Sequence, residues 1–88
     1  MISENDKNVI LTYAKKYKLE KVILFGSSKE RTDARDIDIG VIGLAPELFF
    51  KFWAELDRGL SSPVDVIDLS IDCSFNRLIE KDGLVLYG

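Results

Sequence analysis

The chain has 88 residues, of which 47% are hydrophobic and 31% charged, and its formal net charge is −3. This length suffices for one hydrophobic core, so we expect a single domain over residues 1–88. The acidic balance disfavours nucleic acid as a partner, because a general phosphate-backbone binder needs a basic surface. No apolar run approaches the roughly 20 residues that span a bilayer, and the single Cys73 cannot form an internal disulfide. We therefore expect a cytoplasmic protein without a membrane partner.

The chain contains no histidine. This excludes Ser-His and Cys-His nucleophiles and histidine metal sites on this polypeptide. A Gly-x-x-x-x-Gly-Lys-Ser/Thr loop is also absent, so a P-loop NTPase is not supported. Any catalysis must depend on carboxylates, hydroxyls, cations or metals bound through oxygen.

The first element predicted along the chain is a helix that begins after Ser3 and ends near Lys18. Ser3 is a typical capping residue, and Asp6, three residues on, can reach back to the backbone of Ser3. One apolar face is formed at helical spacing by Ile10, Tyr13, Ala14 and Tyr17. The basic residues at its end complement the helix dipole: Lys15, Lys16, Lys18 and Lys21.

Two strands are predicted next. The apolar run 22–25, closed by Gly26 and Ser27, is typical of a strand buried on both faces. After the polar segment 28–35, apolar and polar residues alternate over 36–41 until Gly43 interrupts them. This alternation predicts a second strand with two unlike faces.

The remaining chain predicts a helix from Pro46 to about Leu60, a strand over 64–68, a short helix that Gly83 ends, and a strand or extended tail over 84–87. The short helix has an apolar face of Phe75, Leu78 and Ile79, and Cys73 is expected to be a small packing residue. This order predicts an α/β (α+β) fold, a small mixed sheet covered by helices.

Aromatic residues are dense in the helix after Pro46, which contains Phe49, Phe50, Phe52 and Trp53. Most are expected in the core, and Phe50 lies off the main apolar face. An exposed remainder could dock a partner helix or a second copy of the chain, giving a homo-oligomer.

Carboxylates on the predicted strands form a candidate metal site. Asp36 and Asp38 project from the same face, and repulsion between them favours a cation such as Mg²⁺, which commonly binds one or two carboxylates plus substrate phosphates. Alone, the pair equally describes a strand with one solvated face. Asp65, on a separate apolar strand, adds a third acid, and three acids from two strands could share two metal ions.

The end of the first strand is a candidate phosphate site. Gly26 lets backbone approach a phosphate, and the hydroxyl of Ser27 can donate a hydrogen bond. The same dipeptide also describes an ordinary tight turn. Lys29, Arg31 and Arg35 could neutralise a triphosphate or be solvated loop charges.

The ordered combination is more specific than its parts: Val22-Ile23-Leu24-Phe25-Gly26-Ser27, then Asp36-Ile37-Asp38-Ile39-Gly40-Val41, then Val64-Asp65-Val66. It resembles the nucleotidyltransferase superfamily that includes DNA polymerase beta, and in particular minimal nucleotidyltransferases, the MNT or MntA-type antitoxins often paired with HEPN-domain toxins. The resemblance covers nearly the whole chain, to the closing Gly83-Leu84-Val85-Leu86-Tyr87.

The resemblance implies a metal-dependent enzyme, an adenylyltransferase that moves AMP from ATP or another nucleoside triphosphate to a hydroxyl of a HEPN-type toxin. It implies that Gly26 and Ser27 hold the phosphates and that Asp36, Asp38 and Asp65 are catalytic and bind two Mg²⁺ ions. The chain departs from the family pattern in the eight residues between Ser27 and Asp36, a shorter loop than usual, and in Arg35, where a serine is common.

Two alternatives remain open at this stage. One is a non-catalytic antitoxin of the same fold that neutralises its partner by contact. The other is a metal- or nucleotide-binding domain without transfer activity.

Overall fold

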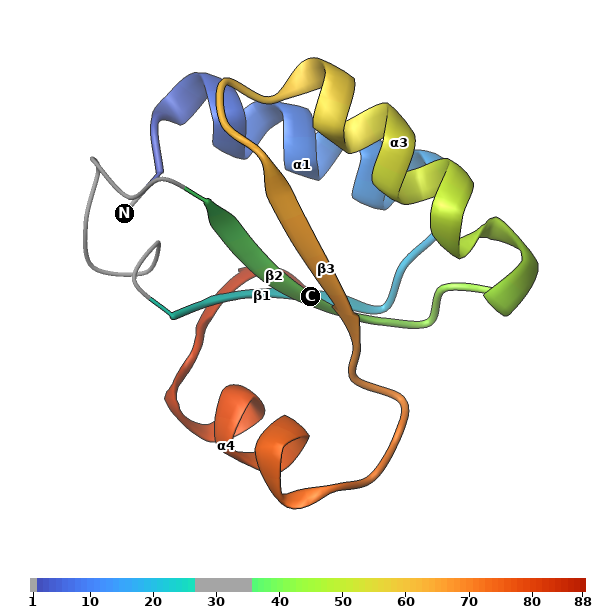
Figure 1. The fold of residues 1–88 in the computed structure, drawn as a ribbon, viewed down its shortest axis with the longest axis vertical. Coiled ribbons are helices and arrows are strands. Elements are labelled where there is room, and N and C mark those ends of the chain that lie inside the picture. Colours follow the sequence, from blue (N-terminus) through green and yellow to red (C-terminus); the bar gives the residue numbers. More distant parts are fainter. Residues whose placement is uncertain (1, 27–35) are drawn as a thin grey trace.

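The computed structural model describes residues 2–26 and 36–88 (Figure 1). Its helices and strands follow the predicted order. In chain order they are α1 (Glu4–Lys16), β1 (Lys21–Phe25), β2 (Ile37–Ile42), the 3₁₀ turn η1 (Pro46–Leu48), α3 (Phe49–Gly59), β3 (Val64–Asp68), α4 (Ser74–Asp82) and β4 (Leu84–Tyr87).

The four strands form one sheet in the order β3-β2-β1-β4. β1 pairs antiparallel with β2 and with β4, whereas β2 and β3 are parallel. Parallel neighbours need a crossover connection, and here η1 and α3 supply it. The predicted small mixed sheet is confirmed.

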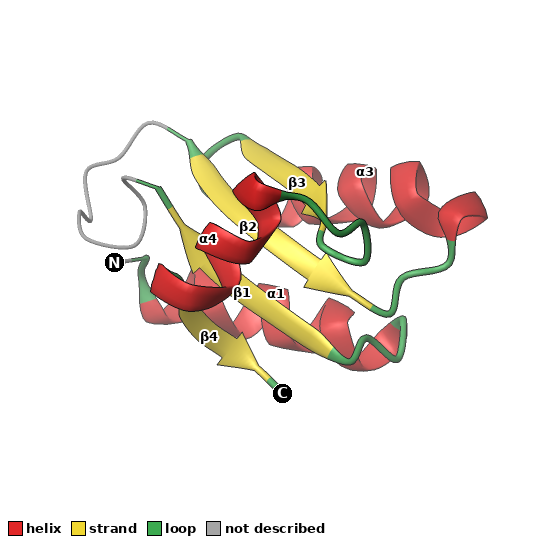
Figure 2. Ribbon diagram, turned by 90° about the horizontal axis from the view of Figure 1, so that it is seen from below, coloured by secondary structure: helices red, strands yellow, loops and turns green. Residues whose placement is uncertain are grey.

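Helices cover both faces of this sheet: α1 and α3 lie on one face and α4 on the other (Figures 1 and 2). The main core lies between the sheet and the α1–α3 layer. Alternation along β2 sends Ile37, Ile39 and Val41 into this core, where each is at most 3% exposed. The helices contribute Ile10, Ala14, Phe52 and Leu56.

A smaller apolar cluster joins α4 to the opposite face of the sheet. Ile23, Leu69 and Ile79 are its buried members. A Cβ atom on Gly40 would lie 2.5 Å from Cδ1 of Leu69, so glycine is required for Leu69 to pack against β2. Because β1 contributes to both clusters, it is buried on both faces, as predicted.

The start of α1 corrects one detail of the prediction. The backbone N–H of Asp6 donates to Oγ of Ser3 at 3.1 Å, which confirms the cap. The Asp6 carboxylate does not accept a hydrogen bond from the backbone of Ser3, as the prediction had it. It is buried and accepts from the backbone N–H and the hydroxyl of Ser61. A buried carboxylate needs strong donors, and Ser61 supplies two of them. This contact ties α1 to the turn that precedes β3.

The end of α1 is also anchored to α3. The helix ends at Lys16, earlier than predicted, and Lys18 takes a positive φ of 56° as the chain turns towards β1. Nζ of Lys16 lies 2.9 Å from Oε2 of Glu55, and the hydroxyl of Tyr17 donates to Oε1 of Glu55 at 2.8 Å. The hydrogen bond from Lys16 is the main reason that the pKa of Glu55 is lowered.

Two expectations about the C-terminal part are wrong in detail. Cys73 is not a packing residue, because it is exposed at the residue before α4. Of the apolar face predicted for α4, only Ile79 is buried, whereas Phe75 and Leu78 are 53% and 55% exposed. The helix is only nine residues long and buries only Asn76 and Ile79, so its other apolar residues remain at the surface.

Candidate nucleotide and metal site

Asp38 and Asp65 lie opposite each other on adjacent strands. They are cross-strand partners in the parallel β2–β3 pair. Asp38 is also the partner of Phe25 on β1, and Phe25 packs on the α4 side, so both carboxylates are on that side of the sheet. Asp38 is half-buried and Asp65 is exposed. Two acids far apart in sequence thus share one surface.

Asp36 lies just before β2 and is exposed. Its charge is close enough to affect Asp38: burial raises the pKa of the Asp38 carboxyl, and the negative charges of Asp65 and Asp36 raise it further. A bound cation would relieve this repulsion and favour the ionised carboxylates.

The carboxylates at this site could supply part of the coordination shell of Mg²⁺. Within residues 2–26 and 36–88, no three Asp, Glu or Cys side chains are grouped closely enough to hold a metal ion by themselves. Mg²⁺ needs no such cage, because it usually takes one or two carboxylates and completes its shell with substrate phosphates and water. The residues that could hold it are therefore Asp38 and Asp65, with Asp36 beside them.

Gly26 brings the end of β1 against Asp38. Its φ is +67°, and a Cβ atom at this position would lie 2.7 Å from Oδ2 of Asp38. A side chain at residue 26 would therefore compete with the Asp38 carboxylate for space. The approach of Gly26 to a phosphate stays a prediction. Ser27, Lys29, Arg31 and Arg35 lie outside the described residues.

Trp53 supports β3 in a way that the sequence analysis missed. Its indole Nε1 donates to the carbonyl oxygen of Val64 at 2.6 Å. The preceding carbonyl, of Pro63, accepts from the N–H of Ile37 on β2, so the Val64 carbonyl points to the open edge of the sheet. Trp53 thus holds the residue immediately before Asp65. The aromatic spacing of α3 predicted only a core position for this side chain.

Trp53→Phe should keep an aromatic ring while removing this donor and part of the indole packing. We expect the free energy of unfolding to fall by at least about 0.5–1.5 kcal/mol, the usual contribution of one such hydrogen bond. Urea denaturation measures the change. Phe50→Leu, at a 77% exposed position of the same helix, is the control and should leave the midpoint in place. An unchanged midpoint for Trp53→Phe would show that the hydrogen bond adds nothing to stability.

A mixed sheet that presents paired carboxylates beside a glycine-closed strand end is the arrangement of a nucleotidyltransferase domain. Residues 7–88 match the family described as "Polymerase beta, Nucleotidyltransferase". This chain therefore belongs to the polymerase beta nucleotidyltransferase family.

Solved structures of toxin–antitoxin complexes share the fold. One, with AMP-PNP, contains a chain 29% identical to this one with a TM-score of 0.76; the match covers 93% of this chain and 73% of that one. A mutant MntA–HpeT complex matches at 27% identity and a TM-score of 0.78, with the same shares covered. A tri-AMPylated Shewanella oneidensis HEPN toxin with its MNT antitoxin matches at 26% and 0.71, covering 94% and 70%.

These neighbours are MNT antitoxins, which confirms the resemblance predicted from the sequence. No curated protein matches the chain. Among the described residues, no helix is long and apolar enough to cross a bilayer.

Proposed function

We propose that this domain, residues 1–88, is a metal-dependent adenylyltransferase that transfers AMP from ATP to a hydroxyl of a HEPN-type toxin and so acts as its antitoxin. The observation that carries the proposal is the pairing of Asp38 with Asp65 beside Gly26. Two carboxylates that face each other on adjacent strands can bind a divalent cation together with substrate phosphates, so the pair suits phosphate chemistry.

Each residue has a role in this proposal. Asp38 and Asp65, with Asp36 beside them, would hold magnesium, and Gly26 and Ser27 would contact the phosphates of the nucleotide. Magnesium, when bound, stabilises the negative charge of the phosphates and of the departing group. The toxin's hydroxyl oxygen forms a bond to the α-phosphorus while the bond to the β-phosphate oxygen breaks, so pyrophosphate leaves. Asp65, which is exposed at the surface, would receive the hydroxyl proton.

The neighbouring structures support the choice of nucleotide and partner. One complex contains AMP-PNP, and in another the HEPN toxin is tri-AMPylated. The mutant complex carries two Asp-to-Glu substitutions two residues apart, the spacing of Asp36 and Asp38 here.

A non-catalytic antitoxin of the same fold is the second candidate. It is favoured by the absence of a three-carboxylate group among the described residues and by the short spacing between Ser27 and Asp36. Such a protein would neutralise its toxin by contact alone.

Intact-mass spectrometry of the partner separates the two candidates. A HEPN-type toxin is incubated with the chain, Mg²⁺ and ATP. We expect the partner to gain one or more adenylate masses, and to gain none when Mg²⁺ is chelated. Neutralisation of the partner without any mass change would favour the contact mechanism instead.

A further inference from the structure

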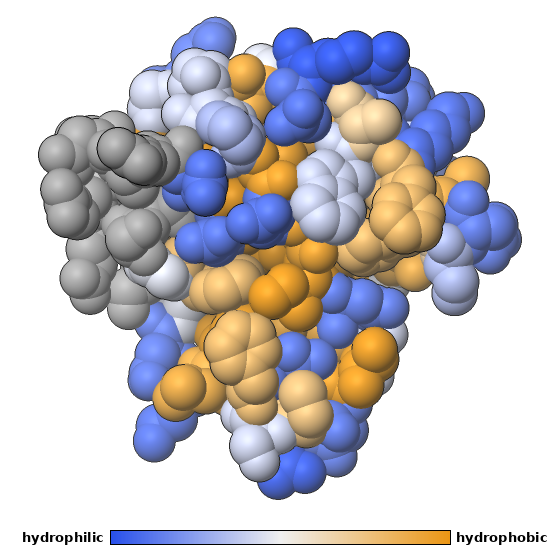
Figure 3. All heavy atoms as spheres, viewed as in Figure 1, coloured by the Kyte–Doolittle hydropathy of each residue, from blue (hydrophilic) through white to orange (hydrophobic). Residues whose placement is uncertain are grey.

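An exposed aromatic ring lies next to the acidic site. Phe75, in the first turn of α4, is 53% exposed. Its ring meets that of Phe25 edge-on, with centroids 6.2 Å apart and an interplanar angle of 86°. Apolar side chains are visible at the surface over α4 and over the neighbouring part of the sheet (Figure 3).

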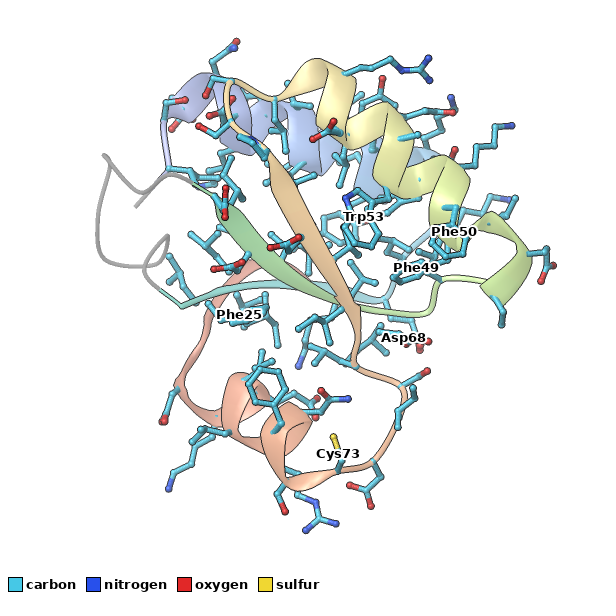
Figure 4. The ribbon with its side chains drawn as sticks, viewed as in Figure 1. Phe25, Phe49, Phe50, Trp53, Asp68 and Cys73 are labelled. Carbon is cyan, nitrogen blue, oxygen red and sulfur yellow. The ribbon has the colours of Figure 1, made fainter. Side chains whose placement is uncertain are left out.

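Phe25 connects this ring to the carboxylates. It is the cross-strand partner of Asp38, so the Phe25 ring and the Asp38 carboxylate leave the sheet on the same side. Figure 4 shows Phe25 on the side of the sheet where α4 lies. Phe75 therefore contacts the residue that pairs with Asp38, at the site that would hold the phosphates.

We propose that Phe75, supported by Phe25, forms the surface on which the base of a purine nucleoside triphosphate stacks while its phosphates lie at Asp38 and Asp65. Because Phe75 is 53% exposed, part of its ring surface is accessible to a planar ligand. A base is also uncharged, and it can lie beside carboxylates that repel a phosphate unless a cation is present. The larger purine ring system should stack better than a pyrimidine.

Exposure alone does not carry this inference. Phe50 is more exposed, at 77%, but it lies on α3, on the opposite side of the sheet, and packs against Phe49. Phe50 therefore serves as a matched control.

The inference rests on the proposed function. A ligand with a base and a ligand without one test the stacking surface separately from the phosphate site. Isothermal titration calorimetry measures the affinities of MgATP and of magnesium tripolyphosphate, which has no base. For Phe75→Ala we expect the affinity for MgATP to fall about 5- to 150-fold, since stacking on an aromatic ring contributes about 1–3 kcal/mol per base. The affinity for tripolyphosphate should stay unchanged.

Two further variants complete the test. Phe75→Tyr keeps an aromatic ring and should bind MgATP as the wild type does. Phe50→Ala should bind both ligands normally.

The possible failures are separable. If the wild type binds neither ligand, the proposed nucleotide function itself is wrong. If the wild type binds both and Phe75→Ala keeps its affinity for MgATP, the stacking surface is refuted while the nucleotide function stands. An equal loss of both ligands in Phe75→Ala would also refute stacking, because it would show that the ring acts on the phosphate site through the fold.

Discussion

Asp38→Asn should lower the rate of adenylate transfer on the order of 1,000-fold while leaving the fold intact. The amide keeps the shape of the side chain and loses the charge that would hold magnesium, and metal stabilisation of a phosphoryl transition state amounts to several kcal/mol. The rate is read from the adenylated mass of the partner over time, and the fold from circular dichroism.

The same substitution should stabilise the metal-free protein. Asp38 faces Asp65 across the β2–β3 pair, and like charges in opposing positions are unfavourable by about 0.2–1 kcal/mol. For a domain of this size, removing that repulsion should raise the melting temperature by about 1–8 °C. Millimolar Mg²⁺ with ATP should raise the melting temperature of the wild type and not that of the variant.

The contribution of Asp38 to the stability of the metal-free protein depends on pH, and the sign of this dependence follows from its pKa. Because folding raises the pKa of Asp38 above its ordinary value of 3.8, the proton favours the native state. That stabilisation is complete below the pKa of the unfolded chain and is lost as the pH rises through the higher native pKa. The stability advantage of Asp38→Asn over the metal-free wild type should therefore grow as the pH rises from about 4 and then level off.

Asp57→Asn, an equal change of charge at an exposed position of α3, is the matched control and should alter neither activity nor stability appreciably. If Asp38→Asn unfolds the chain, the carboxylate is structural. If the variant folds and transfers adenylate at the normal rate, Asp38 does not hold the metal.

The strands and helices were predictable because each follows a local rule. The apolar run 22–25 and the alternation over 36–41 are short-range patterns, and the structure contains β1 and β2 at these positions. Gly26 could also be placed at a strand end from sequence alone. The pairing between strands could not be predicted, because the sequence does not show which residues of β2 and β3 lie opposite one another.

The register of that pairing decides the site. A shift of one residue would bring Asp38 opposite Val64 or Val66 instead of Asp65 and would send one of the two acids to the other face. Contacts between distant segments fix the register here: Trp53 holds Val64, and Asp6 holds Ser61, just before β3. Neither contact has a local signature. The exposure of Phe75 could not be predicted either, because an apolar helical face indicates burial until the packing is known.

Gly26→Ala should combine a moderate loss of stability with a large loss of activity. Residue 26 has a φ of +67°, a conformation that costs an alanine about 1–2 kcal/mol. This cost corresponds to a fall in melting temperature of roughly 4–16 °C. The added methyl group would also lie 2.7 Å from Oδ2 of Asp38, so the carboxylate must move away from its position beside Asp65.

The displacement of Asp38 should make Gly26→Ala lose activity beyond what its lower stability explains. Misplacing a catalytic group by about 1 Å can cost 100-fold in rate, so we expect a loss of that order at a temperature where the variant is fully folded. Gly43→Ala is the control: Gly43 also has a positive φ, of 92°, but its Cβ would meet Glu20, at the opposite end of β2. Gly43→Ala should lose at least as much stability and keep normal transfer activity when folded. If both variants lose activity only in proportion to their unfolding, the close approach of Gly26 to Asp38 has no part in the reaction.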